Sequence, residues 1–113
     1  MSWRAGGIRP WIVQRLSALV MVAVLLTFMA TMMLAAPSNF QEWQDFLAGG
    51  VWNTVLIIFW LSLFAHAWIG MRDVFMDYIA HDALRFVTLG SFAFFIIAMI
   101  IWMFKIMIMA ETL

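Results

Sequence analysis

The stretch Leu61-Ser62-Leu63-Phe64-Ala65-His66-Ala67-Trp68-Ile69-Gly70-Met71-Arg72-Asp73 decides the fold of this chain. It places a histidine inside an otherwise apolar run, and the run ends at the charged pair Arg72-Asp73. Such a run suits the hydrocarbon core of a membrane, where an ionisable side chain is energetically expensive and therefore suggests a functional role. His66 is the first candidate site residue.

The composition of the chain also favours a bilayer environment. Of its 113 residues, 67% are hydrophobic and only 11% are charged. Soluble domains carry about 25% charged residues, and a small domain cannot bury this much apolar surface in water. The chain has no cysteine, which excludes disulfides, iron–sulfur ligation and covalent haem attachment by this chain. Zero net charge without a basic run argues against nucleic acid as a partner.

Three apolar stretches have the length of membrane-spanning helices, because roughly 20 residues cross the hydrocarbon core. The sequence predicts one membrane-anchor domain over 1–113, with an irregular arm at 1–14 and transmembrane helices at about 15–36, 51–71 and 83–108. A cleaved signal peptide is the alternative for the first stretch, since Leu34-Ala35-Ala36 resembles a cleavage site. The apolar run is longer than the ~7–15 residues of a signal core, however.

A short interfacial helix is expected between the first two spans, over about 39–47. Pro37 ends the first span, and Ser38 and Asn39 precede Gln41 and Glu42 by three residues, which is the spacing of a capping box. Asp82 is the expected N-cap of the third span.

The basic residues predict the orientation of the spans. One side carries Arg4, Arg9, Arg15, Arg72 and Arg85, whereas the other carries only Lys105. The positive-inside rule then places the N-terminus in the cytoplasm and the C-terminus in the periplasm. The expected fold is therefore an all-α membrane protein with three transmembrane helices and a short interfacial helix after the first.

His66 has three possible roles on the basis of its position alone. Ser62, His66 and Gly70 are spaced four apart and share one small, polar helix face, which suits close approach of a helix or a flat cofactor. The imidazole could bond a neighbouring helix, relay protons in a transporter or ligate haem iron. A transporter would need more polar groups inside the membrane. His81 lies in the following loop and cannot serve the opposite face of the same iron, so a bis-histidine haem would need a ligand from a second chain.

Three further residues have both a structural and a functional interpretation. The Tyr78 hydroxyl belongs either to an aromatic belt or to a site where it donates to a quinone carbonyl, with Asp77 beside it. We expect the chain to leave the membrane before this pair. Arg15 is either a topology anchor or a partner for a haem propionate, because Arg pairs well with carboxylates.

The block His66-Ala67-Trp68-Ile69-Gly70-Met71 and the pair Asp77-Tyr78 resemble the small, haem b-containing hydrophobic membrane anchors of proteobacterial succinate dehydrogenases. Arg15 and Leu84-Arg85 are similar to the same pattern, and the resemblance is specific over about Leu61–Arg85. Arg72-Asp73 depart from it, since the family carries an aromatic and an uncharged polar residue there. That departure affects the charge at the expected quinone entrance.

The resemblance implies a membrane-anchor subunit of succinate–ubiquinone oxidoreductase (respiratory complex II) in the bacterial inner membrane. It implies that His66 is an axial ligand of haem b shared with a second membrane anchor, that Tyr78 and Asp77 bind ubiquinone, and that Arg15 neighbours a haem propionate. The implied partners are this second membrane anchor, an iron–sulfur subunit and a flavoprotein subunit, and succinate is not oxidised in this chain. A fumarate reductase anchor using menaquinol and a non-catalytic structural membrane protein are the alternatives.

Overall fold

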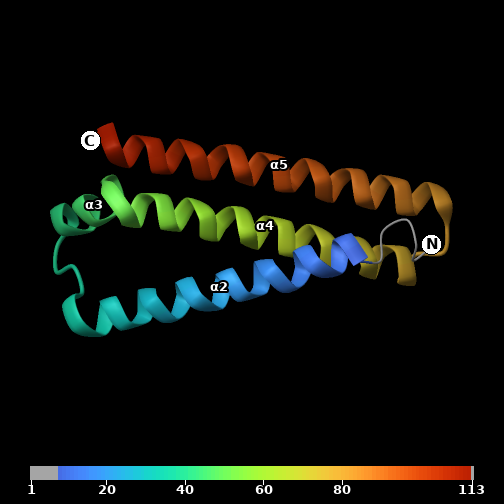
Figure 1. Cartoon of the computed structure of the whole chain (residues 1–113). Helices are drawn as coiled ribbons and strands as arrows, with labels where there is room; N and C mark the ends of the chain where they lie inside the picture. The colour runs from blue at the N-terminus through green and yellow to red at the C-terminus, as the bar shows by residue number, and fades with distance from the viewer. Residues whose placement is uncertain (1–7, 113) are drawn as a thin grey trace.

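The chain folds into four helices in the computed structural model, which describes residues 8–112. The helices are α2 (Ile8–Ala35), α3 (Phe40–Ala48), α4 (Gly50–Tyr78) and α5 (Asp82–Thr112) (Figure 1). The three long helices are apolar and long enough to cross a membrane. The predicted all-α fold, with three transmembrane spans and a short helix after the first, is confirmed.

Helix α4 lies between the other two long helices (Figure 1). It packs against both α2 and α5, and α3 packs against α4 and α5. The bundle is elongated, 50 Å along its longest axis, so the helix termini form two separate ends. We call one the arginine end, where Arg9, Arg15, Arg72 and Arg85 lie near the termini of α2, α4 and α5. The other is the α3 end, where α3 lies beside the last turns of α5 (Figure 1).

Two helix boundaries differ clearly from the sequence prediction, and α5 also continues beyond about residue 108, to Thr112. Helix α2 begins at Ile8, so an irregular arm is wrong for residues 8–14, while residues 1–7 lie outside the described part. Helix α4 continues to Tyr78 instead of ending near Met71. Both predictions followed the end of the apolar run, but backbone hydrogen bonds can continue a helix beyond it. At 1.5 Å per residue α4 is about 43 Å long, which exceeds the ~30 Å hydrocarbon core.

The N-cap predicted before α3 is present at Asn39, whose side chain accepts a hydrogen bond from the Glu42 backbone N–H at 2.9 Å. The Glu42 carboxylate accepts from the backbone N–H and the hydroxyl of Ser38, at 2.7 and 2.9 Å. Ser38 precedes the N-cap, so the reciprocal bond lies one residue before its place in a capping box. The hydrogen bond from the Ser38 backbone N–H, and to a smaller extent the one from the Ser38 hydroxyl, hold the pKa of the Glu42 carboxyl below its usual value.

The predicted cap of α5 is wrong. The imidazole of His81, and not Asp82, accepts a hydrogen bond from the Leu84 backbone N–H at 3.2 Å. Arg85 fixes the same turn, because its Nε donates to the Ile79 carbonyl at 2.9 Å. His81 and Arg85 therefore join the end of α4 to the start of α5.

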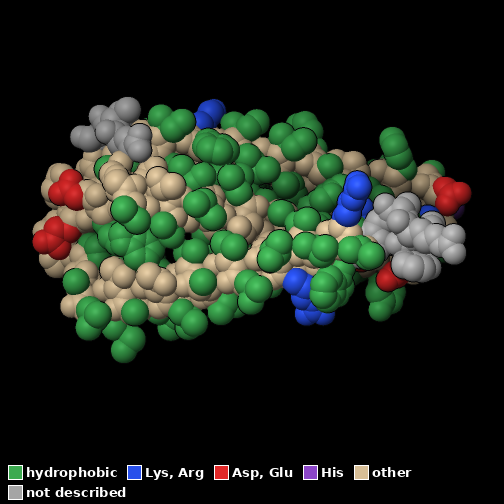
Figure 2. All heavy atoms as spheres, in the orientation of Figure 1, with side chains coloured by type: hydrophobic (Ala, Val, Ile, Leu, Met, Phe, Trp, Pro, Cys, Tyr) green, Lys and Arg blue, Asp and Glu red, His purple; other side chains and the backbone are tan. Residues whose placement is uncertain are grey.

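A small core joins α4 to α5. Phe64 packs with Ile96, Met103 and Met107, and Ala67 packs at its edge. Trp68 stacks on Phe92 of α5, with ring centroids 6.1 Å apart. Phe64, Ala67 and Trp68 thus face α5. Figure 2 shows many hydrophobic side chains on the face in view, as expected for a chain whose solvent is lipid.

Asn53 is the polar residue that links three helices at the α3 end. Its side chain is buried, and its Nδ2 donates to the carbonyls of Leu47 at 2.7 Å and Met107 at 3.2 Å. Leu47 belongs to the last turn of α3, where carbonyls lack helical partners. Asn53 therefore ties α4 to both α3 and α5.

Candidate functional site

The face of α4 that carries His66 lies against α2. A Cβ added to Gly70 would stand 3.5 Å from the Gln14 side-chain nitrogen, in ordinary contact. His66, one turn earlier, also contacts Gln14. The predicted shared face of His66 and Gly70 is therefore present, and it packs against α2.

The half-buried His66 ring makes three polar contacts, all with α2. Its Nδ1 lies 3.3 Å from the backbone carbonyl oxygen of Gln14 and 3.2 Å from the hydroxyl oxygen of Ser17. Its Nε2 lies 3.4 Å from the side-chain nitrogen of Gln14, which is a long contact. The Ser17 hydroxyl itself donates to the Gln14 carbonyl at 3.0 Å.

Gln14 and Ser17 are site residues that the sequence reasoning missed. They stand three apart on one face of α2, the spacing at which helix side chains are neighbours, and Ser17 is one of only two buried polar residues in the structure's described part. A polar pair near the start of an apolar span, on the same side as His66, was the signal that could have found them.

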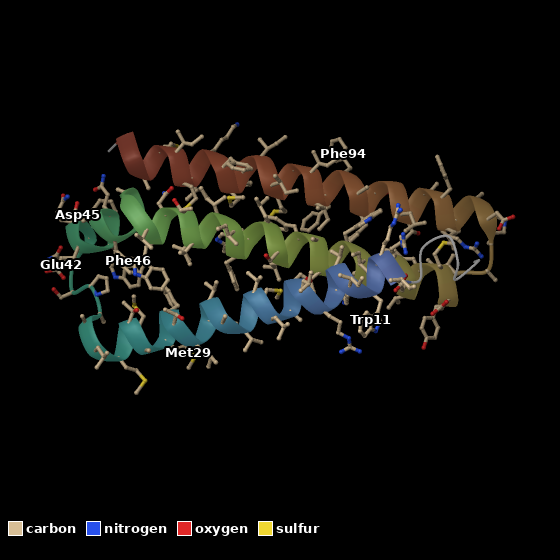
Figure 3. All side chains as sticks on the ribbon, in the orientation of Figure 1. Trp11, Met29, Glu42, Asp45, Phe46 and Phe94 are labelled. Atoms are coloured by element: carbon tan, nitrogen blue, oxygen red, sulfur yellow. The ribbon has the colours of Figure 1, made fainter. Side chains whose placement is uncertain are left out.

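Arg15 is not brought to the His66 ring. Its guanidinium lies 5.3 Å from the centre of the Trp11 ring, a cation–π distance. Figure 3 shows Trp11 on the face of α2 that points away from α4 and α5. Arg15 follows Gln14 directly, but one helical step turns it about 100° away. In this chain it therefore lies on the outer surface of the arginine end.

Tyr78 and Asp77 lie together at the last turn of α4. The side chain of Tyr78 is 83% exposed, and Asp77 is exposed as well. Within residues 8–110, neither side chain forms a hydrogen bond. Because α4 is continuous, Tyr78 stands twelve residues, or about 18 Å, along the axis from His66. The two groups are on one helix at different depths.

Arg72 and Asp73 contact each other between these two positions. Arg72 Nη2 lies 3.5 Å from Asp73 Oδ1, a loose ion pair. The Arg72 side chain is 29% exposed, and its Nε is buried with no partner in the described part of the chain. The pair adds one charge of each sign near the end of α4, without net charge.

The donor set around His66 suits one kind of metal group. No three His, Cys, Asp or Glu side chains gather to hold a metal ion anywhere in the residues described. A single imidazole on a membrane span suits iron that already has four ligands from a porphyrin, as in haem. The buried Gln14 Oε1, which has no partner in residues 8–112, lies beside the same ring contacts. The His66 imidazole could supply one ligand to a haem iron if the Gln14 side chain leaves Nε2.

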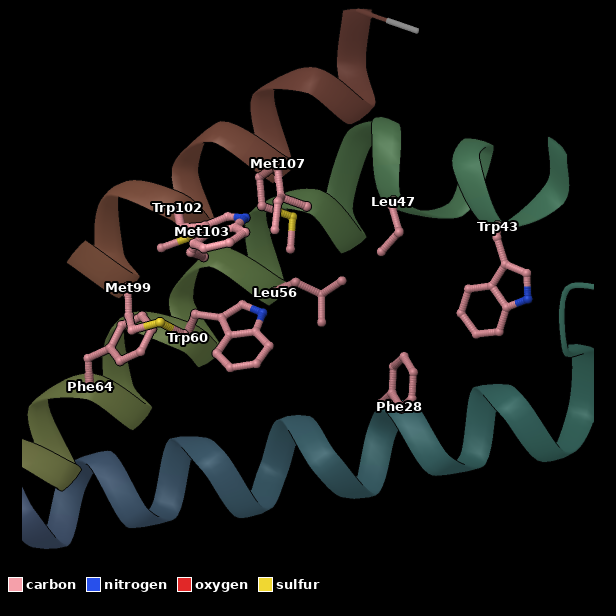
Figure 4. Close-up of a pocket in the computed structure, with 11 residues that line it drawn as sticks. Phe28, Trp43, Leu47, Leu56, Trp60, Phe64, Met99, Trp102, Met103 and Met107 are labelled. Carbon is pink, nitrogen blue, oxygen red and sulfur yellow. The ribbon is translucent and has the colours of Figure 1, made fainter. Parts of the chain in front are cut away.

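An apolar cavity lies toward the α3 end, away from the arginine end. It measures about 550 Å³, and all four helices contribute to its walls. Figure 4 shows Phe28, Trp43 and Trp60 projecting into the same space. Its lining residues are Phe28, Trp43, Leu47, Leu56, Trp60, Phe64, Met99, Trp102, Met103, Ile106 and Met107. None of the sequence-predicted site residues borders it.

Similarity to known proteins extends over nearly the whole chain. The succinate dehydrogenase/fumarate reductase transmembrane subunit family matches residues 2–107. A relative from Coxiella burnetii, a succinate dehydrogenase hydrophobic membrane anchor subunit, is 24% identical over 96 residues, which are 85% of this chain and 84% of the relative. No solved structure matches the chain. The family match includes parts of all three long helices and is not confined to the block around His66.

Proposed function

The chain belongs to the succinate dehydrogenase/fumarate reductase transmembrane subunit family, and we propose that it is the small hydrophobic anchor of a haem b-containing succinate–ubiquinone oxidoreductase. It is a multi-pass protein of the bacterial inner membrane that anchors the catalytic subunits of such a complex. The similarity to an anchor named for succinate dehydrogenase supports this direction of the reaction. Succinate is oxidised elsewhere in the complex, by the flavoprotein subunit.

His66 is the proposed axial ligand of a haem b shared with a second membrane anchor. The observation that carries this proposal is a half-buried imidazole on a membrane span, with Gly70 one turn away on the same face. When bound, the haem supplies a one-electron redox centre. His66 would bind the iron, the apolar spans would exclude water, and the second histidine ligand would come from the other anchor.

Tyr78 and Asp77 are the proposed contribution of this chain to ubiquinone binding. The exposed Tyr78 hydroxyl is free to donate to a quinone carbonyl, and a carboxylate stands next to it in the chain. Arg72 and Asp73 border the entrance as a charge-balanced pair. Arg15 is accessible on the outer face of α2, where a haem propionate or another carboxylate can approach it from outside the chain.

The arginine end faces the cytoplasm in this proposal. Four arginines of the described chain lie there, and Glu42 and Asp45 lie at the α3 end. The positive-inside rule then sets the orientation. The iron–sulfur subunit binds on the cytoplasmic side and delivers electrons close to Tyr78, so quinone is reduced at the same membrane face.

A reduced-minus-oxidised spectrum of the co-purified complex tests the haem assignment. We expect a low-spin bis-histidine spectrum that His66→Ala perturbs, while succinate oxidation with a soluble acceptor survives. His81→Ala is the matched control, because His81 is the other histidine of the chain and its imidazole caps α5. An unchanged spectrum in His66→Ala would remove His66 as the ligand.

A fumarate reductase anchor using menaquinol is the second candidate, because the matching family includes fumarate reductases. The quinone extracted with the complex separates the two. Ubiquinone supports the proposed direction, and menaquinone with net fumarate reduction supports the alternative. A complex without any haem absorbance would favour a purely structural anchor.

A further inference from the structure

The contacts of the His66 ring favour one of its two neutral tautomers. A backbone carbonyl can only accept a hydrogen bond, and the Gln14 carbonyl lies 3.3 Å from Nδ1. A proton on Nδ1 turns that contact into a hydrogen bond. In the other tautomer the Nδ1 lone pair would face the carbonyl lone pairs at the same distance.

The two remaining contacts agree with a proton on Nδ1. The Ser17 hydroxyl donates its only proton to the Gln14 carbonyl, which leaves its lone pairs to accept from Nδ1–H at 3.2 Å. At the other ring nitrogen, the Gln14 side-chain amide points a donor nitrogen toward Nε2 at 3.4 Å. That contact is compatible with a lone pair on Nε2, and the acceptor-only Gln14 carbonyl at Nδ1 carries the choice of tautomer.

We propose that Ser17 and the Gln14 carbonyl on α2 orient His66 for the iron, with Ser17 as a positioning residue. The inference rests on the proposed haem. An Nδ1–H held by two acceptors fixes the ring and makes Nε2 a stronger electron donor. Stronger donation favours ferric iron, so Ser17 lowers the haem midpoint potential.

The Gln14 side chain has a second, opposing role. Its amide lies over Nε2, the position that iron takes when haem binds. The contact is long, and the Oε1 of the same amide is buried without a partner in residues 8–112, so a movement of this side chain would break little hydrogen bonding. Because this amide covers Nε2, haem binding would require the Gln14 side chain to turn aside. Its backbone carbonyl stays in place as part of α2.

The test compares variants of the complete, co-purified complex. Ser17→Ala removes one acceptor of Nδ1–H, and Ser17→Thr restores a hydroxyl. Thr27→Ala is the matched control, because Thr27 lies on the same helix and its hydroxyl bonds only to the Ala23 carbonyl. The readouts are the haem midpoint potential, the low-spin electron paramagnetic resonance signal, and the fraction of haem kept through detergent washing.

We expect Ser17→Ala to raise the midpoint potential and to weaken haem retention roughly tenfold. A tenfold change in relative affinity for ferric and ferrous iron equals about 59 mV for one electron. Ser17→Thr and Thr27→Ala should match the wild type. Should Ser17→Ala not assemble, Ser17→Cys, with sulfur as a weak acceptor, should shift the potential in the same direction. Gln14→Leu, which keeps the carbonyl, should retain haem at least as well as the wild type.

Two results would overturn the inference. An assembled Ser17→Ala complex with wild-type potential, resonance signal and haem retention refutes the role of Ser17 while leaving His66 as a ligand. Loss of haem in Gln14→Leu refutes the assigned role of that side chain. Absence of haem from the wild-type complex is a different result, because it overturns the proposed cofactor and this inference together.

Discussion

Replacing Tyr78 by phenylalanine separates the quinone role from the aromatic-belt role. The substitution keeps the ring and deletes only the hydroxyl. Tyr78 is 83% exposed at the end of α4, and its hydroxyl forms no hydrogen bond within residues 8–110. Exposed substitutions of this kind change stability by no more than about 0.5 kcal/mol. If the hydroxyl donates to a quinone carbonyl, its loss removes roughly 1–3 kcal/mol, which is about 5- to 150-fold in rate or affinity.

The assay measures two activities of the same membranes. Succinate-dependent ubiquinone reduction should fall by that factor in Tyr78→Phe, and succinate oxidation with a soluble acceptor upstream should persist with an intact haem spectrum. Asp82→Asn is the control, since its side chain is 98% exposed at the same end and makes only a 4.0 Å ion pair. Wild-type ubiquinone reduction in an assembled Tyr78→Phe complex would refute the reasoning and return Tyr78 to the aromatic belt.

Three further predictions concern topology and stability. A reporter fused after Leu113 should be periplasmic and one within Ile79–Asp82 cytoplasmic; the reverse would contradict the orientation. Asn53→Leu removes two interhelical hydrogen bonds and should lower the free energy of unfolding by roughly 1–3 kcal/mol, measured as thermal inactivation of the complex at a lower temperature. Thr54→Val loses a hydrogen bond within α4 alone and should leave the inactivation temperature unchanged. Because its pKa is lowered, the Glu42 carboxylate stabilises the fold at neutral pH, and this contribution should fade as the pH falls through that pKa. A Glu42→Gln chain whose melting temperature falls with acid pH just as that of the wild type does would refute this contribution.

Much of the fold follows from the chain's hydropathy. Long apolar runs predict spans because the bilayer leaves the backbone no other way to satisfy its hydrogen bonds. The ends of the helices were less predictable. Residues 8–14 and 72–78 are helical although charged residues interrupt them, because a helix needs only backbone bonds and solvent for its side chains. Apolar content marks where a span ends and does not mark where a helix ends.

The sequence predicted the residues that α4 contributes to the candidate site, but not those that α2 contributes. The cost of a buried ionisable group made His66 a candidate, and spacing alone put Gly70 on its face. The partners on α2 depend on how two helices cross, which no local pattern contains. Gln14 and Arg15 are neighbours in the sequence, yet one contacts His66 and the other lies against Trp11 on the outer face. The resemblance pointed to Arg15, and the packing added Gln14.

The continuity of α4 gives the proposed mechanism its geometry. Had the helix ended near Met71, the position of Tyr78 relative to His66 would depend on a loop. Instead the two residues are joined by three turns of unbroken helix, which fixes them about 18 Å apart along the axis. Asp77, eleven residues from His66, then returns to nearly the same helix face. One rigid helix would therefore hold both the proposed haem ligand His66 and the proposed quinone donor Tyr78, and Arg72-Asp73 place a charge-balanced pair between them without changing their spacing.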